Sequence, residues 1–235
     1  MEKNFYAVIM AAGSGSRMGS EIPKQFLPLG GVPVLRRTID KFTRAVPGVR
    51  IVTVLPKDSV PYWKQYCAAH FSHCPQLLVE GGITRFHSVR NALEKIPDGA
   101  VVAIHDGVRP LLSEDLIRRM AERMRDCRAL IPVIPMVDTL KVLDRGPGGG
   151  WVTAEGEEAD RARVFGAQTP QMFRSEDLKS AYAQAYDTAF TDDASVARRK
   201  GIPLSYIEGE RYNLKITTPD DLRLAEAILS LTGER

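Results

Sequence analysis

Short apolar runs alternate with longer amphipathic stretches along most of this chain, and this alternation restricts the possible folds more than any other feature. The runs are bounded by glycine, proline or polar residues and lie at 6–11, 50–55, 76–80, 100–104 and 129–134. The stretches between them space their apolar residues as helices do and lie at 34–43, 58–71, 84–96 and from Glu114 onward. Because neighbouring parallel strands need helical crossovers, the pattern predicts an α/β fold with a Rossmann-like, mostly parallel sheet flanked by helices.

The alternation breaks after residue 138. Two short runs, 139–144 and 151–155, flank the sequence Arg-Gly-Pro-Gly-Gly-Gly, which predicts a β-hairpin with a loose tip. Strands and helices then alternate again, with strands expected at 164–168 and 204–208 and helices at 175–186, 192–200 and from Thr218. The simplest organisation is one domain, residues 1–235, with residues 138–163 as a β-arm insertion that protrudes from the α/β body.

The composition excludes several classes of protein. With 32 Lys and Arg against 29 Asp and Glu in 235 residues, the net charge of +3 is too balanced for a dedicated nucleic-acid binder. An odd number of cysteines, three, argues against a secreted disulfide framework. No apolar run approaches the roughly 20 residues that span a bilayer, and glycines and Arg17 follow the first run too closely for a signal peptide. We therefore expect a cytoplasmic protein that binds neither nucleic acid nor membrane.

A glycine-rich loop follows the first expected strand and carries the strongest chemical signal. Its glycines, among them Gly13 and Gly15, let backbone N–H groups approach a phosphate chain without a Cβ in the way. Arg17 and Lys24 come within reach of this loop, and a triphosphate needs both donors that wrap it and cations that neutralise it. Met18 stands where a dinucleotide fingerprint needs its third glycine, and no Gly-Lys-Ser/Thr follows, which excludes that fingerprint and a P-loop.

Several short motifs occur in an order that resembles one family of enzymes. They are Ala11-Ala-Gly-Ser-Gly-Ser-Arg-Met18 with Pro23-Lys-Gln25, Glu80-Gly-Gly82 with Arg85 and Ser88, His105-Asp106 with Arg109-Pro110, Asp138-Thr-Leu-Lys141, Gln168-Thr-Pro-Gln171, Thr191-Asp-Asp-Ala-Ser195 and Asn213-Leu-Lys-Ile-Thr217. Over about residues 7–229 the chain resembles the 2-C-methyl-D-erythritol 4-phosphate cytidylyltransferases of the non-mevalonate isoprenoid pathway, within the nucleotidyltransferase superfamily. Each motif alone is short, but their combination is highly specific.

The resemblance implies that CTP and 2-C-methyl-D-erythritol 4-phosphate give 4-diphosphocytidyl-2-C-methyl-D-erythritol and pyrophosphate. Mg²⁺ would be held mainly by the CTP phosphates, without a dedicated metal-ligating residue. The family's catalytic positions correspond to Arg17, Lys24, Arg161 and Lys215. Its nucleotide-binding positions correspond to Ala11, Ala12, Gly13, Gly15, Gly81, Gly82 and Ser88. Its contacts with the polyol phosphate correspond to Asp106, Arg109, Thr139, Thr169 and Thr191.

The chemistry of the implied substrate agrees with these residue types. A phosphate monoester has a second pKa near roughly 6, so it is largely ionised at neutral pH and needs no general base. Positioning and charge neutralisation suffice, which suits a motif set built on Arg and Lys. One position departs from the family, because Ile83 follows Gly82 where the family has an acidic residue.

The expected β-arm predicts a dimer. An isolated two-stranded hairpin is marginal in water, so its apolar residues need a surface to cover them. These residues are Leu140, Val142, Leu143, Trp151 and Val152. A second copy of the chain is the expected cover, since two-fold homodimers are the commonest soluble assemblies. The resemblance implies exchanged arms, with Thr139 and Arg161 serving the partner's active site.

Two alternative functions stay open at this point, and two weaker signals are discounted. A related enzyme for another polyol phosphate, such as ribitol 5-phosphate, would share the chemistry of the first loop. A regulatory module that binds nucleotide without turnover would be expected to lack some of the catalytic cations, and all four are present. The sequence Cys67, His70, His73 and Cys74 could suggest zinc, but it lacks the separated ligand pairs of a zinc finger. Asp192 and Asp193 are expected to begin a helix rather than to bind a ligand.

Overall fold

A mostly parallel sheet lies at the centre of the structure, a computed structural model that describes residues 4–13, 22–70, 74–154 and 159–233. Within these residues the sheet has eight strands in the order β10-β7-β11-β6-β1-β4-β5, and β12 also pairs with β7. The strands are β1 (Phe5–Met10), β4 (Arg50–Leu55), β5 (Gln76–Glu80), β6 (Val101–Asp106), β7 (Ala129–Pro135), β10 (Phe165–Ala167), β11 (Gln171–Arg174) and β12 (Ser205–Glu208). Only β10 and β11 run antiparallel to their neighbours.

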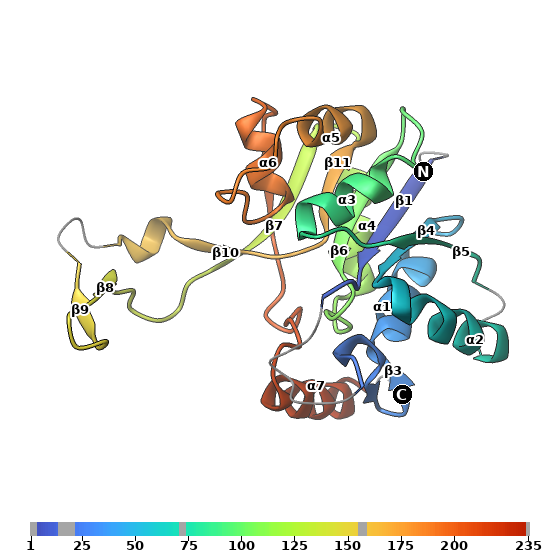
Figure 1. Ribbon diagram of the computed structural model, residues 1–235, viewed down its shortest axis with the longest axis horizontal. Helices are drawn as coiled ribbons and strands as arrows, with labels where there is room; N and C mark the ends of the chain where they lie inside the picture. The colour runs from blue at the N-terminus through green and yellow to red at the C-terminus, as the bar shows by residue number, and fades with distance from the viewer. Residues whose placement is uncertain (1–3, 14–21, 71–73, 155–158, 234–235) are drawn as a thin grey trace.

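Helices cover both faces of this sheet (Figure 1). They are α1 (Val34–Ala45), α2 (Val60–His70), α3 (Arg85–Leu93), α4 (Glu114–Arg123), α5 (Ser175–Tyr182) and α6 (Asp193–Arg199). A further helix, α7 (Pro219–Thr232), lies away from the sheet (Figure 1). Successive side chains of a strand point to opposite faces, and β1 shows what this does. Ala7 and Ile9 join a buried cluster with α1 and α4, whereas Tyr6 and Val8 join another with α3, α5 and α6. The expected α/β fold with a flanked, mostly parallel sheet is thus confirmed.

Several boundaries differ from those expected. β11 was missing from the expected strands, because its buried residues Gln171, Met172 and Phe173 show no polar alternation over so short a run. The helix expected at 175–186 ends at Tyr182. The strand expected at 100–104 runs on through His105 to Asp106, which pair with Ile9 and Met10 of β1. The carboxyl end of β6 therefore lies further along the chain and includes a candidate substrate contact.

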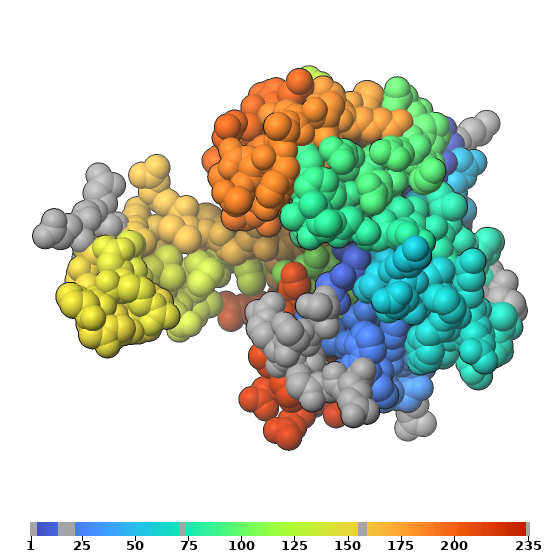
Figure 2. All heavy atoms as spheres, viewed as in Figure 1, coloured from blue at the N-terminus to red at the C-terminus, as the bar shows by residue number. Residues whose placement is uncertain are grey.

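The expected hairpin is present but shorter than the two runs that predicted it. β8 (Leu143–Arg145) pairs antiparallel with β9 (Trp151–Thr153), and residues 139–142 form no strand. The hairpin stands well away from the α/β body, on connections that leave β7 and return to β10 (Figures 1 and 2). Val142, Leu143, Trp151 and Val152 are all exposed there.

The remaining short elements join the body around its edges. They are the strands β2 (Pro28–Leu29) and β3 (Val32–Pro33) and the 3₁₀ turns η2 (Lys24–Phe26), η3 (Lys57–Ser59) and η4 (Arg161–Arg163). α7 packs through Ile228 and Leu229 on a third buried cluster with Leu29 and Ile216. No helix in the described parts of the chain combines the length and apolar character that crossing a membrane requires.

Candidate active site

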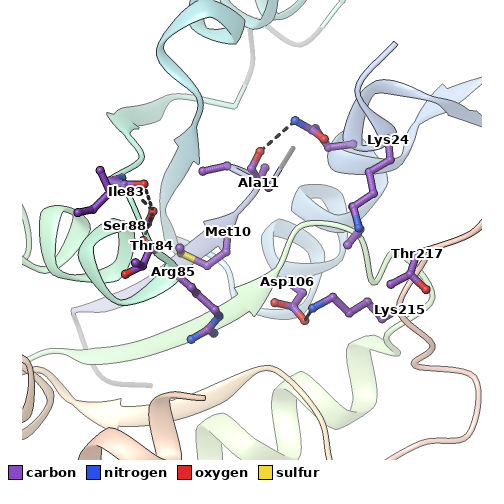
Figure 3. A pocket seen from close by; sticks show the side chains of 15 residues that line it. Met10, Ala11, Lys24, Ile83, Thr84, Arg85, Ser88, Asp106, Lys215 and Thr217 are labelled. Atoms are coloured by element: carbon purple, nitrogen blue, oxygen red, sulfur yellow. Dashed lines mark hydrogen bonds and ion pairs between the residues drawn. The ribbon is translucent and has the colours of Figure 1, made fainter. Parts of the chain in front are cut away.

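A pocket of about 500 Å³ opens at the carboxyl ends of β1 and β6, in the middle of the sheet. Open α/β sheets bind ligands at this edge, and the volume lies in the range of roughly 300–1,000 Å³ typical of small-molecule sites. Figure 3 shows the pocket and the side chains around it. It brings together many of the expected site residues: Ala11, Ala12, Gly13, Lys24, Gly82, Ser88, Asp106 and Lys215.

The segment after β1 is held by backbone bonds rather than by its own side chains. The Ala11 N–H donates to the Val54 carbonyl at 2.9 Å, and the Gln25 amide donates to the Ala11 carbonyl at 3.0 Å. A Cβ added to Gly13 would meet no atom within 4 Å, so the backbone there faces open space. Gly15 and Arg17, which were expected to complete this loop, lie outside the described residues.

The Gly81-Gly82 pair is required by close packing. A Cβ on Gly81 would come within 2.6 Å of the Ala12 side chain, and a Cβ on Gly82 within 2.5 Å of that of His87. The Gly82 N–H donates to the Ser88 hydroxyl at 2.9 Å, which in turn donates to the Thr84 carbonyl at 2.9 Å. Thr84 caps α3 by accepting from the His87 N–H. This wall of the pocket is therefore fixed before any ligand arrives.

Ile83 stands at the pocket wall and is 91% exposed. Its side chain makes this position apolar where the resemblance led us to expect a carboxylate. The neighbouring backbone of Gly82 still faces the pocket.

Asp106 is an acidic residue of the pocket that forms ion pairs with two cationic side chains. Its Oδ2 lies 3.0 Å from Lys215 Nζ and 3.3 Å from Arg109 Nε (Figure 3 shows the Lys215 pair). Burial by itself would raise the pKa of Asp106. The positive charges of Lys215, Arg85 and Arg109 outweigh burial and hold this pKa well below its usual range. The ionised carboxylate thus fixes the two cations that were expected to face the polyol phosphate.

Lys24 reaches the same pocket from another part of the chain. It begins the 3₁₀ turn η2, and its Nζ donates to the Ile216 carbonyl at 3.3 Å, next to Lys215. Two lysines 191 residues apart in the chain therefore line one pocket. Paired cations of this kind suit a ligand that carries several negative charges.

Arg85 is a pocket residue that sequence reasoning noted in a motif but did not assign to the site. It lies at the start of α3, and its guanidinium makes a bidentate pair with Asp193 at 2.9 and 2.6 Å. Asp193 is fully buried and also accepts from the Tyr182 hydroxyl at 2.5 Å. Burial alone would lower the pKa of Arg85, but Asp193 raises it above its usual value. The pair locks the start of α3 to the start of α6.

Five other described residues of the pocket were not assigned to the site from the sequence. They are Met10, Gln25, Thr84, Val108 and Thr217. Thr217 is held by Asp221, which accepts from its hydroxyl at 2.6 Å and its N–H at 2.8 Å. Gln25 and Thr217 belong to the quoted motifs of Lys24 and Lys215, and this membership was the signal available in the sequence.

Among the described residues, five expected threonine and arginine contacts do not line the pocket. Arg109 lies beside it, paired with Asp106. The other four lie in three places. Thr169 is buried beside β6, where its hydroxyl accepts from the Asp106 N–H at 3.1 Å. Thr191 lines a separate cavity of about 600 Å³ between β7, β10 and α6. Thr139 and Arg161 are exposed on the β-arm, where Arg161 Nη1 donates to the Val137 carbonyl at 2.8 Å. The single chain does not bring these arm residues to the pocket (Figure 1).

Two weaker signals are explained by local structure. Asp192 caps α6, since its side chain accepts from the Ser195 N–H at 2.8 Å, as expected. Cys67, Cys74 and Cys127 are free, and burial raises the pKa of Cys74 to about 11. Among the described residues, which exclude His73, no three His, Cys, Asp or Glu side chains are grouped to hold a metal ion.

The fold and the pocket define an α/β protein with a pocket lined by cationic side chains at the carboxyl edge of its sheet. A family model described as 2-C-methyl-D-erythritol 4-phosphate cytidylyltransferase matches residues 5–231. Among curated relatives, proteins of that name from Bacteroides thetaiotaomicron and Porphyromonas gingivalis strain W83 are each 43% identical to this chain. The first matches over 222 residues (94% of this chain and 98% of the relative), the second over 231 residues (98% and 100%).

Solved structures give the same result. The 4-diphosphocytidyl-2C-methyl-D-erythritol synthase of Anaerococcus prevotii is 29% identical, with a TM-score of 0.79 over 97% of each chain. The 2-C-methyl-D-erythritol 4-phosphate cytidylyltransferase of Thermus thermophilus is 30% identical, with a TM-score of 0.71 over 95% of this chain and 98% of that one. The chain therefore belongs to the 2-C-methyl-D-erythritol 4-phosphate cytidylyltransferase family.

Proposed function

We propose that this enzyme transfers the cytidylyl group of CTP to the phosphate of 2-C-methyl-D-erythritol 4-phosphate and releases pyrophosphate. The observation that carries the proposal is the family match over residues 5–231, because every residue that lines the pocket lies within it. The lysines in that pocket fit a reaction between two phosphate-bearing molecules.

In this reaction the substrate phosphate attacks the α-phosphorus of CTP, and pyrophosphate leaves. The substrate phosphate is largely ionised at neutral pH, so the protein need not remove a proton from it. We assign Lys24, together with Arg17, to the charge that develops on the departing pyrophosphate. Lys215 and Arg109, both held by Asp106, face the attacking phosphate. Their task is to hold two anions in line at close range.

Mg²⁺ is part of this proposal, and the described residues of the pocket offer it one carboxylate ligand. Mg²⁺ in such sites binds through one or two carboxylates together with substrate phosphates. Asp106 is the one carboxylate among the described residues that line the pocket, and its Oδ2 already holds two cations. The triphosphate oxygens would therefore supply most ligands. When bound, the ion neutralises charge on the phosphates.

We further propose a homodimer joined through the β-arm. Thr139 and Arg161 would then reach the pocket of the partner subunit. The proposal is supported by the exposed apolar side chains of a hairpin that stands away from its own body (Figure 2). A large exposed apolar group is costly to leave in water, and a second chain can cover it. We also propose a cytoplasmic location. It is supported by the three free cysteines, because thiols stay reduced in that compartment.

Pyrophosphate release tests the proposed reaction. The enzyme is assayed with each of CTP, UTP, ATP and GTP against 2-C-methyl-D-erythritol 4-phosphate, and CTP is repeated with ribitol 5-phosphate. We expect turnover with CTP and the methylerythritol substrate to exceed every other pair. A preference for a purine nucleotide, or for ribitol 5-phosphate, would overturn the named reaction.

A further inference from the structure

His105 is a fully buried side chain at the carboxyl end of β6 to which the proposed function gives no task. Its ring lies between two hydrogen-bonding partners and packs against the edge of Phe42, with ring centroids 5.2 Å apart. Nε2 lies 3.3 Å from the Arg109 carbonyl oxygen, and Nδ1 lies 3.0 Å from the Thr169 hydroxyl. Both partners belong to residues expected to bind the polyol phosphate.

The positions of the protons follow from what each partner can do. The Arg109 carbonyl can only accept, so Nε2 must carry the ring proton and donate it. Burial lowers the pKa of His105 to about 4, so the ring is neutral at working pH and carries only that proton. Asp106 and Arg109 are the charged side chains nearest to it, and their effects on the pKa are opposite. Nδ1 is therefore an acceptor.

This arrangement determines which atom receives the hydroxyl proton of Thr169. The Thr169 oxygen already accepts the Asp106 N–H at 3.1 Å. Since Nδ1 needs a donor, the Thr169 hydroxyl must give its single proton to His105. No proton is left for a ligand phosphate, and Thr169 is itself buried. The Thr169 hydroxyl is thus not free to donate to the polyol phosphate, with which the resemblance implied a contact.

The same bonds hold the turn that presents Asp106 and Arg109. Thr169 fixes the turn at the Asp106 amide, and His105 fixes it at the Arg109 carbonyl. The Arg109 N–H closes the turn on the Asp106 carbonyl at 3.1 Å. The Arg109 guanidinium is aimed by the Asn213 carbonyl at 2.6 Å.

We propose that His105 is a positioning residue for the polyol phosphate, acting through Thr169 and through the Arg109 carbonyl. The inference rests on the proposed function. His105 sets the direction of the Thr169 hydroxyl and holds the 106–109 turn in the shape in which Asp106 and Arg109 face the substrate. It touches neither substrate itself.

Nitrogen NMR on the wild-type enzyme tests the proton assignment without any reaction. We expect Nε2 of His105 to give the resonance of a protonated ring nitrogen and Nδ1 that of an unprotonated one, with no titration near the ordinary value of roughly 6.5. Thr169→Val, which removes the hydroxyl but keeps the shape, should shift the Nδ1 resonance. A ring protonated on Nδ1, or a His105 that titrates near 6.5, would refute the proposal.

A double-mutant cycle in steady-state kinetics tests the functional part. In His105→Gln the amide N–H can take the place of Nε2 toward Arg109, while no acceptor stands at the position of Nδ1, so this variant and Thr169→Val break the same bond. We expect each to raise KM for 2-C-methyl-D-erythritol 4-phosphate about tenfold, the scale of one lost hydrogen bond, while KM for CTP stays unchanged. The double variant should be no worse than the worse single one. Thr169→Ser should restore the wild-type KM.

Thr53→Val is the matched control, because Thr53 is also a buried threonine whose hydroxyl donates a hydrogen bond. It lies in β4 and donates to Gln76 of β5, and neither residue lines the pocket. This variant should change neither KM. Full additivity of Thr169→Val and His105→Gln would show that Thr169 contacts substrate independently, against the proposal. If His105→Gln does not fold, Thr169→Val and the NMR spectra still decide. A wild-type enzyme without this activity would refute the proposed function but leave the NMR test intact.

Discussion

The pocket and the β-arm both carry residues expected to serve one reaction, but they hold these residues in opposite ways. In the pocket, Asp106, Lys215 and Arg85 are tied to one another or to buried partners by ion pairs. On the arm, Thr139 and Arg161 are exposed on the two connections that join the short hairpin to the α/β body. Rigid positioning is what charge stabilisation requires. The difference teaches that the folded chain prepares the pocket part of the site, while the arm residues would reach a pocket only in the homodimer proposed above.

Lys24→Ala should have the largest effect on the pocket side of this comparison. A charge-assisted contact made in the transition state is worth on the order of 3 kcal/mol, so kcat should fall about 10²-fold while the fold persists. Steady-state kinetics and circular dichroism measure both quantities. Lys95→Ala, which removes an exposed lysine at the end of α3, should leave kcat unchanged. Near-normal kcat for a folded Lys24→Ala enzyme would remove Lys24 from the catalytic set.

Asp193→Ala should have the next largest effect. It should lower the free energy of unfolding more than a substitution on the arm does. It leaves Arg85 without its buried partner, and breaking a buried pair costs about 3–5 kcal/mol. Because the Arg85 side chain is 34% exposed, water screens the pair, and we expect a loss below that range, about 2–3 kcal/mol in the free energy of unfolding. Asp144→Ala removes an exposed acid from the arm and should change this free energy little. Equal losses in denaturant titrations would contradict the contrast between pocket and arm.

Asp221→Asn should have the smallest effect and a defined pH dependence. Burial would raise the pKa of Asp221, but hydrogen bonds from Thr217 and Thr218 lower it to about 2. A lowered pKa means that the carboxylate stabilises the fold above its ordinary pKa of about 3.9, and that this contribution disappears as pH falls through about 2. The difference in unfolding free energy between wild type and variant should be about 0.5–1 kcal/mol near pH 7. A difference that stays constant down to pH 2 would exclude this role.

The sheet was largely predictable from sequence, and its exceptions have physical causes. Buried parallel strands are continuous apolar runs, so β1, β4 and β7 are readily recognised in the sequence. β11 was missed because four residues, three of them buried, carry neither a period nor a turn signal of their own. β6 was expected to end before His105 and Asp106, since polar residues usually mark a strand end. Tertiary partners satisfy both side chains and let the strand continue.

Site residues were predictable where the motif itself carries the chemistry. The glycines beside Ser88 and the lysines of the pocket belong to this class. The Arg85–Asp193 pair joins residues 108 positions apart, and no local pattern announces it. The role of Thr169 was also beyond sequence, because it depends on which atom faces His105. The motifs therefore predicted which residue types take part in the site. Only the fold shows which of these side chains already bind one another through hydrogen bonds and ion pairs.

The account's central claim is that two chains complete each active site, and mixing two inactive variants tests it most directly. Chains with Lys24→Ala and chains with Arg161→Ala are combined under conditions in which subunits exchange, and exchange is followed by co-purification of differently tagged chains. With crossed arms, one site of a mixed dimer inherits both defects and the other inherits neither, so each mixed dimer should regain about half of the wild-type activity. Demonstrated exchange with activity no higher than that of the two parent variants would contradict the claim.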